Sequence, residues 1–171
     1  MQLNYELMHQ NKPHEFNKID PNIDHLKAVL REDDELLDAG CCEGHLYGNL
    51  KHSKYTGVDV VEKNILAARD RYHGVDFRVG DIFDLDGKWD VVFCCRVLMH
   101  LPDYEENVKK LRSLARRLLV VVVPVRNDSM IIETSGVEFR TYSPETIQAT
   151  GPIEVKIGIK YSTVMYGPRI S

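Results

Sequence analysis

The stretch from residue 35 to residue 44 constrains the fold more than any other part of the chain. It reads Glu-Leu-Leu-Asp-Ala-Gly-Cys-Cys-Glu-Gly, a short apolar run with one acid that gives way to small residues and two glycines. This pattern predicts a buried strand that turns sharply into a helix over residues 45–51. After a parallel strand, such a turn lets a ligand lie directly against the main chain. The sequence therefore predicts a ligand-binding turn.

Strand-like and helix-like segments alternate on both sides of this turn. Apolar spacing predicts further strands at residues 54–61, 76–79, 89–95 and 117–125. Helices are expected from Asn22 or Asp24, over 62–72 with Ile65, Leu66 and Ala68 facing inward, and from Pro102 to about Ala115. Five alternations with short connections predict an α/β, doubly wound sheet that is mostly parallel.

The last third of the chain departs from this rhythm. Residues 130–134 and 137–142 alternate around Ser135-Gly136, which predicts a small hairpin. Ser143-Pro144-Glu145 is expected to start a short helix. Residues 153–160 and 163–166 then predict an antiparallel C-terminal strand pair, which brings the sheet to seven strands.

Length and charge limit the remaining possibilities. A chain of 171 residues that is 43% hydrophobic forms one domain. We expect an arm at 1–21, a ligand-binding half at 22–125 and a substrate-side segment at 126–171. A formal charge of −4 gives no general attraction to nucleic acid. Five basic residues at apparent helical spacing predict a solvated face: Lys109, Lys110, Arg112, Arg116 and Arg117.

Neither the apolar runs nor the cysteines indicate a membrane or secreted protein. The longest apolar run, residues 118–123, is too short to cross a bilayer, and the first residues lack a signal pattern. The four cysteines form two adjacent pairs, Cys41-Cys42 and Cys94-Cys95, which suits neither a disulfide framework nor a metal site. We therefore expect a soluble, cytoplasmic protein with free thiols and no metal.

Four motifs in sequence order carry a family resemblance. They are Leu-Leu-Asp-Ala-Gly-Cys-Cys-Glu-Gly (36–44), Tyr-Thr-Gly-Val-Asp (55–59), Arg-Val-Gly-Asp-Ile-Phe (78–83) and Trp-Asp-Val-Val-Phe-Cys-Cys-Arg-Val-Leu-Met-His-Leu-Pro-Asp (89–103). Together they resemble the class I S-adenosylmethionine-dependent methyltransferases over roughly residues 22–125. The resemblance implies a Rossmann-like sheet with S-adenosyl-L-methionine as cofactor and S-adenosyl-L-homocysteine as product.

The resemblance also implies a division of labour at the cofactor. Asp59 would accept both ribose hydroxyls, Asp81 would lie near the adenine amino group, and the Ile82 amide would meet a ring nitrogen. Carbonyls near Gly40 and Cys94 or Cys95 would receive the ammonium. The implied cofactor-binding residues are Ala39, Gly40, Cys41, Cys42, Gly44, Asp59, Val60, Asp81, Ile82, Cys94 and Cys95. Asp38 is expected to hold the turn together instead.

Cys42 departs from the family pattern, which usually has glycine at this position. Its Cβ narrows the space beside the amino-acid part of the cofactor. If the first and fourth strands are neighbours, Cys42 and Cys95 could come close enough for redox chemistry, although small residues filling tight space is the simpler interpretation.

His100 is the candidate catalytic residue, because it lies in a Leu-Met-His-Leu-Pro stretch near the expected mouth of the site. It could take a proton from an acceptor hydroxyl or amine, or it could simply pack and position the loop. Further candidates for substrate contact are Tyr104, Glu133, Arg140 and Tyr142.

Methyl transfer to a small molecule is thus the predicted function, with alternatives left open. One is a protein of the same fold that binds the cofactor without turnover, or serves as a partner subunit. The other is a nicotinamide-dependent dehydrogenase, which also uses a glycine turn followed by an acid. The dinucleotide turn places glycines at positions equivalent to 40, 42 and 45, whereas this chain has Gly40, Cys42 and His45.

Overall fold

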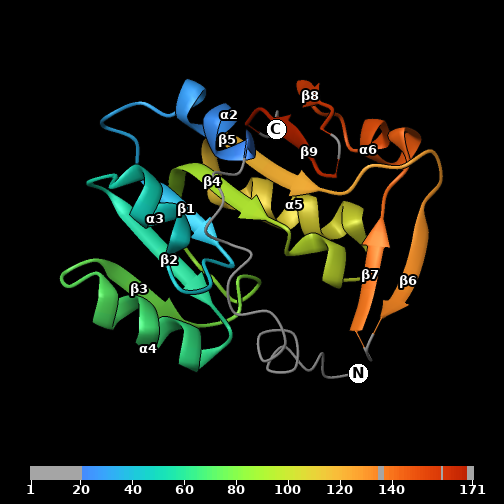
Figure 1. Cartoon of the computed structure of the whole chain (residues 1–171). Helices are drawn as coiled ribbons and strands as arrows, with labels where there is room; N and C mark the ends of the chain where they lie inside the picture. The colour runs from blue at the N-terminus through green and yellow to red at the C-terminus, as the bar shows by residue number, and fades with distance from the viewer. Residues whose placement is uncertain (1–20, 135–136, 159, 169–171) are drawn as a thin grey trace.

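A seven-stranded sheet forms the centre of the protein. The computed structural model describes residues 21–134, 137–158 and 160–168. The strand order is β3-β2-β1-β4-β5-β9-β8 (Figure 1). Strands β1 to β5 are parallel to one another, β9 runs antiparallel to β5, and β8 runs antiparallel to β9. The strands are β1 Leu36–Ala39, β2 Tyr55–Asp59, β3 Asp76–Val79, β4 Trp89–Cys95, β5 Ala115–Val123, β8 Glu154–Lys156 and β9 Ser162–Tyr166. The predicted α/β, mostly parallel sheet with its closing antiparallel pair is confirmed.

Helices cover both faces of the sheet. Helices α2 (Pro21–Val29), α3 (His45–Leu50) and α4 (Glu62–Arg71) pack on one face, through Leu26, Leu46 and Ile65 among others. Helix α5 (Tyr104–Leu114) packs on the opposite face, as does Ile147 of α6 (Pro144–Ala149). Each buried strand contributes alternate residues to the two cores, which explains why β4 and β5 are apolar along nearly their whole length.

A hairpin stands beside the main sheet. Strands β6 (Met130–Thr134) and β7 (Val137–Thr141) form a separate antiparallel pair, as the sequence predicts, and its turn lies outside the described residues (Figure 1). Strand β7 contacts the short 3₁₀ helix η2 (Leu98–His100), which follows β4. The hairpin is therefore joined to the loop at the end of β4.

Two expectations about the surface are wrong. The chain passes directly from α5 into β5 at Ala115, so Arg116 belongs to a strand and not to a helix face; Arg117 lies in this strand, as predicted, but is not part of a solvated face. Arg117 reaches back to pair with the buried carboxylate of Asp34, an ion pair that sequence spacing alone could not indicate. In α4, Leu66 is 55% exposed, because the buried stripe runs through Asn64, Ile65 and Ala68.

Within the described part of the chain, no helix combines the length and the apolar character that crossing a membrane requires.

Candidate functional site

The predicted cofactor-binding residues gather at the carboxyl edge of the sheet. Parallel register pairs Ala39 of β1 with Val58 of β2, and Asp59 with Val79 of β3. Strand β4 pairs with β1 on the other side. The turn after β1, the acid ending β2, the loop after β3 and the end of β4 therefore meet along one edge, the usual place for ligands in such sheets.

The turn after β1 is held close to its neighbours. Gly40 has φ +84°, and a Cβ there would lie 2.2 Å from Cγ2 of Val97. Gly44 has φ +75°, and a Cβ there would lie 2.7 Å from Cζ of Phe77. Both positions therefore require glycine, for conformation and for space.

Cys42 occupies the same turn in an unusual conformation. Its φ is +50°, in the left-handed region where a Cβ costs about 1–2 kcal/mol. The geometry explains why glycine would suit this position. The amide of Cys42 donates to Oδ2 of Asp59 over 2.9 Å, which stabilises the turn against that strain.

Asp59 ends β2 as a buried carboxylate. It is 9% exposed; besides the bond from Cys42, its Oδ1 accepts from the amide of Val61 over 2.9 Å. Since each carboxylate oxygen can accept two hydrogen bonds, both retain one acceptor position. Asp59 therefore has the capacity to take two hydroxyls while it fastens the turn.

Asp81 organises the loop after β3. Its Oδ1 accepts from the amide of Phe83 over 2.9 Å, a local turn that leaves the carboxylate exposed. The side chain of Ile82 is 5% exposed and packs into the core beneath. Val60, which follows Asp59, is 42% exposed at the same edge.

Asp38 lies behind the turn and joins β1 to β2. It is 3% exposed and accepts a hydrogen bond of 2.6 Å from the hydroxyl of Tyr55. Burial raises the pKa of Asp38 to about 7, since desolvation outweighs the hydrogen bond from Tyr55 and the negative charge of Asp59 adds to it. The expectation that Asp38 holds the turn together agrees with this contact.

All four cysteines are free thiols. Cys94 and Cys95 pack into opposite cores, as adjacent residues on a strand must. Burial raises the pKa of Cys42 to about 12 and also raises the pKa values of Cys41 and Cys94. These three thiols are therefore protonated at neutral pH, which disfavours redox or nucleophilic chemistry.

His100 packs beneath the hairpin. It is 7% exposed, its ring centroid lies 4.9 Å from that of Phe139, and its Nδ1 lies 3.4 Å from the carbonyl oxygen of Glu138. A role as general base stays a prediction, because this environment suits a positioning role equally well.

The other candidates for substrate contact have separate environments. Tyr142 donates to the carbonyl of Leu98 over 2.6 Å and packs 4.3 Å from the ring of Tyr104. Arg140 pairs with Glu138 at 2.6 Å, and Glu133 lies on the exposed strand β6. Tyr104 and Tyr142 are thus core residues, whereas Arg140 and Glu133 remain on the hairpin.

Sequence reasoning missed a pair at the end of β4. Arg96 follows Cys95 directly, and its guanidinium lies 5.2 Å from the ring centroid of Tyr161, which precedes β9. The position of Arg96 at a strand end is the one signal that could have indicated it. The position of Tyr161 depends on how the last strands pair, which the sequence pattern does not specify.

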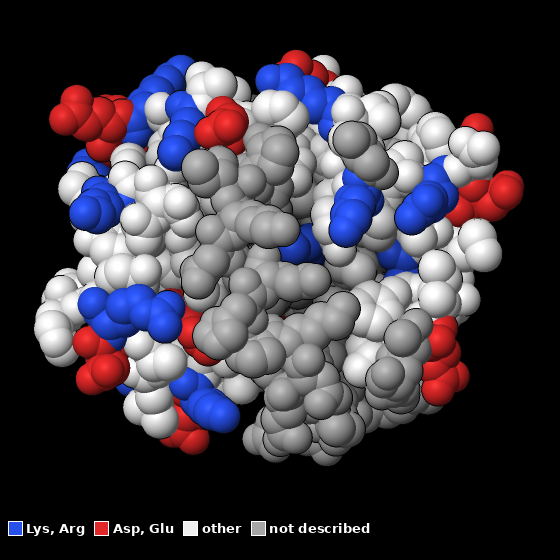
Figure 2. All heavy atoms as spheres, viewed as in Figure 1, with Lys and Arg blue, Asp and Glu red and all other residues white. Residues whose placement is uncertain are grey.

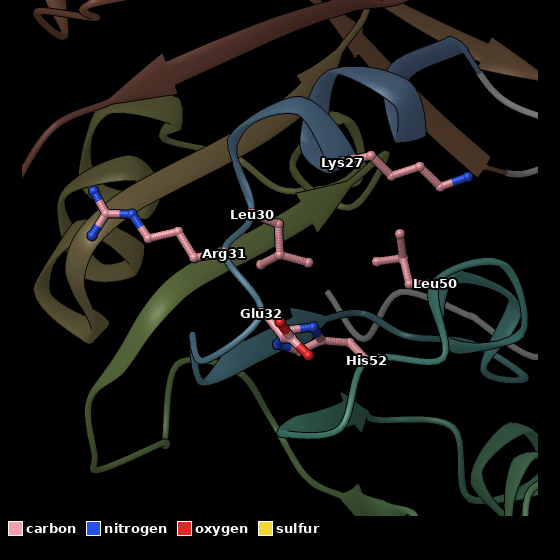
Figure 3. A pocket seen from close by; sticks show the side chains of 6 residues that line it. All are labelled: Lys27, Leu30, Arg31, Glu32, Leu50 and His52. Carbon is pink, nitrogen blue, oxygen red and sulfur yellow. The ribbon is translucent and has the colours of Figure 1, made fainter.

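The opposite edge of the sheet carries two surface hollows. One of about 360 Å³ is lined by six residues at the ends of α2 and α3 (Figure 3): Lys27, Leu30, Arg31, Glu32, Leu50 and His52. The other, of about 520 Å³, lies at the amino ends of β2 and β3. Both lie at the edge away from Gly40 and Asp59. Basic and acidic side chains are intermixed around the face drawn in Figure 2.

Comparison with known sequences identifies the domain type. Residues 37–119 match the family model described as "Methyltransferase domain". The ubiquinone biosynthesis O-methyltransferases of Bordetella parapertussis and Bordetella bronchiseptica are 33% identical over an alignment 93 residues long, and the match covers 47% of this chain and 38% of each relative. The chain thus covers well under half the length of these curated relatives.

Solved structures share the fold. The 1,6-didemethyltoxoflavin-N1-methyltransferase of Burkholderia thailandensis matches with a TM-score of 0.73 at 21% identity, over 88% of this chain and 77% of that one. The magnesium protoporphyrin IX methyltransferase of Synechocystis PCC 6803 matches with a TM-score of 0.65 at 22% identity, over 87% and 79%. At these identities the likeness concerns the fold.

Proposed function

We propose that the chain is a class I S-adenosylmethionine-dependent methyltransferase and that it transfers a methyl group from S-adenosylmethionine to a small-molecule acceptor. In this proposal residues 22–125 hold the cofactor and residues 126–171 face the acceptor. The family match favours this reaction over hydride transfer with a nicotinamide cofactor.

The observation that carries the proposal is the buried carboxylate of Asp59 beside the glycine turn. A ribose carries two adjacent hydroxyls, and Asp59 retains one acceptor position on each oxygen. Gly40 and Gly44 let the turn pack tightly against Val97 and Phe77 at the end of β1, where any side chain would clash. These residues therefore fit the sugar and amino-acid parts of the cofactor, and the exposed Asp81 fits its adenine amino group.

The chemistry asks little of the protein beyond alignment. When bound, the cofactor supplies a methyl group activated by its sulfonium charge. The chain would orient the acceptor for in-line displacement and exclude water, which are the main contributions expected where no protein nucleophile is needed. The hairpin β6–β7 and η2 are the elements placed for this task, since they pack together beyond the end of β4.

His100 is proposed to take the acceptor proton, should the acceptor be a hydroxyl or an amine. Its support is its place on η2, between the end of β4 and the hairpin. The matching test replaces His100 with Gln and follows the pH profile of turnover: loss of the acidic limb supports the base, and an unchanged profile rejects it.

The names of related proteins support a small acceptor. The relatives include ubiquinone biosynthesis O-methyltransferases, and the structural neighbours include enzymes named for a toxoflavin precursor and for magnesium protoporphyrin IX. All of these are small molecules.

One observation favours a second candidate function, namely cofactor binding without turnover. Cys42 places a Cβ where the family usually has glycine, beside the amino-acid part of the cofactor. In this candidate, the narrowed site holds the cofactor without presenting its methyl group to an acceptor.

Isothermal titration calorimetry tests the binding step. We expect S-adenosylmethionine and S-adenosylhomocysteine to bind, NAD not to bind, and Asp59→Asn to weaken binding at least tenfold because the paired sugar contact is lost. Asp70→Asn, an exposed carboxylate on α4, is the matched control. Binding of NAD alone would reject the proposal.

Release of S-adenosylhomocysteine with a panel of hydroxylated and amino-bearing small molecules tests turnover. Release that depends on one acceptor supports the enzyme. Tight binding with no release across the panel supports the second candidate.

A further inference from the structure

Arg96 places a cation at the edge of the sheet where the proposed cofactor lies. It directly follows β4 and has φ +60°, a left-handed conformation that is uncommon for a residue with a Cβ. Its amide donates to the carbonyl of Val122 in β5 over 2.8 Å, which fixes the backbone. The left-handed conformation and the hydrogen bond to Val122 together fix the point at which the chain leaves the sheet.

The side chain of Arg96 is held as well as its backbone. The guanidinium lies 5.2 Å from the ring centroid of Tyr161, within the range of a cation–π contact, and its Nε atom is buried. Tyr161 comes just before β9, whose first residue pairs with the last residue of β5. The aromatic ring therefore reaches Arg96 from the same carboxyl edge.

The charge of Arg96 also extends toward the glycine turn. His45 opens α3 immediately after Gly44, and its pKa is lowered first by burial and then by the positive charges of Arg71 and Arg96, against the effect of Glu43. Arg96 therefore contacts Tyr161 next to β9, and its charge acts electrostatically on His45 at the start of α3.

The charge of Arg96 matters because the carboxylates near the turn are negative. Glu43 lies on the turn and Asp59 is hydrogen-bonded to it. An anionic ligand group beside them would be repelled without a compensating cation. In the amino-acid part of the cofactor, ammonium and carboxylate share one carbon, so a carboxylate must lie next to any carbonyls that receive the ammonium at the ends of β1 and β4.

We propose that Arg96, held against Tyr161, binds the α-carboxylate of the amino-acid part of the cofactor. The inference rests on the proposed function and deepens it, since it assigns a partner to the carboxylate of the cofactor, which Gly40, Asp59 and Asp81 do not bind. Arg96 is then a binding residue, and Tyr161 is a positioning residue that acts through it.

Two ligands that differ in this group provide the test. S-adenosylhomocysteine contains the amino-acid part, whereas 5′-methylthioadenosine has the same adenosine and sulfur without it. For Arg96→Gln in the full chain, we expect calorimetry to show about tenfold to hundredfold weaker binding of S-adenosylhomocysteine, as for the loss of a charge-assisted hydrogen bond, and unchanged binding of methylthioadenosine.

Further variants separate charge from packing. Arg96→Lys should recover part of the affinity for S-adenosylhomocysteine, because it keeps the charge but loses the planar fork. Tyr161→Leu should weaken the same ligand severalfold, whereas Tyr161→Phe should not, because it keeps the ring. Arg116→Gln, at an exposed ion pair on the amino edge, is the matched control and should bind both ligands as the wild type does.

The outcomes distinguish this inference from the function on which it rests. Failure of the wild type to bind either ligand overturns both. Wild-type binding of both ligands, with Arg96→Gln weakening them equally or not at all, overturns the carboxylate assignment alone. If Arg96→Gln does not fold, as judged by thermal unfolding, the ratio of the two affinities in Arg96→Lys decides the question, and an unchanged ratio overturns the assignment.

Discussion

The residues of the glycine turn combine strain, burial and charge within a few positions. Gly40 and Gly44 have no room for a Cβ, Cys42 bears one in a left-handed conformation, and Asp38 is buried behind them. Strain of this kind persists only where surrounding contacts enforce it. At this turn the enforcing contact is the hydrogen bond from Cys42 to Asp59.

Asp38 predicts a pH-dependent stability. Its pKa rises from 3.8 to about 7 on folding, so its stabilising contribution is complete below about pH 4 and is lost as the pH rises toward 7. Relative to the wild type, Asp38→Asn should therefore gain up to about 4 kcal/mol in unfolding free energy between pH 4 and pH 8. Urea unfolding across this range measures the difference.

Asp70→Asn on the exposed face of α4 is the control for that series and should give a flat difference. A flat difference for Asp38→Asn as well would mean that the carboxyl of Asp38 ionises as in the unfolded chain.

Replacing Cys42 should raise the affinity for the cofactor, whereas most substitutions at a binding site lower it. Cys42→Gly should tighten the binding of S-adenosylhomocysteine severalfold, because it removes the Cβ beside the amino-acid part and relieves the left-handed strain. Calorimetry measures the change. Cys42→Ala keeps the Cβ and removes only the sulfur, so it should resemble the wild type; equal gains in both variants would assign the effect to the thiol.

Among the elements, the hairpin β6–β7 depends on its contact with η2. The hydroxyl of Tyr142 donates to the carbonyl of Leu98 over 2.6 Å, and Phe139 packs on His100. Tyr142→Phe should cost about 1 kcal/mol and raise amide hydrogen exchange over residues 98–101 more than in β1. Hydrogen-exchange mass spectrometry gives the comparison.

Protection of residues 98–101 that equals the wild type, despite lower global stability, would contradict the proposed joining of hairpin and η2. Thr141 lies one residue earlier, at the end of β7, and bonds within the hairpin region, so Thr141→Val serves as a control that should not affect η2 selectively.

The sequence predicted the helices and strands well where a local pattern determines where an element begins or ends. Strands β3 and β4 have the expected bounds. β3 lies between Gly74 and Gly80, and β4 is an apolar run after Asp90. Ser143 caps α6 by accepting from the amide of Thr146. It failed where Arg116 and Arg117 were grouped with the basic residues of α5 as one solvated face, because the sequence does not show that Arg117 pairs with the buried Asp34.

For the candidate site, as for the fold, the sequence predicted local features but not long-range contacts. The strand ends that carry Gly40, Asp59 and Asp81 follow from local patterns, and they meet at one edge as expected. The contact between Arg96 and Tyr161 joins distant segments through the pairing of β5 with β9. Such long-range contacts depend on strand order, which local periodicity does not encode.

For the molecule as a whole, ligand binding should stabilise the fold. S-adenosylhomocysteine at 100 times its dissociation constant should add about 2.7 kcal/mol and raise the melting temperature by roughly 5–10 °C for a chain of this size. Differential scanning calorimetry measures the shift, and NAD at the same concentration is the control. Equal shifts with both ligands would indicate nonspecific binding.

The hydrogen bond between Asp59 and Cys42 connects the proposed sugar-binding carboxylate to the glycine turn. The carboxylate that would grip the sugar also closes the turn over which the rest of the ligand would lie. A ligand bound at Asp59 would change the surroundings of this hydrogen bond, so the amide proton of Cys42 becomes a reporter of binding. Its nuclear magnetic resonance frequency would follow the arrival of an adenosyl group without any added label at the site.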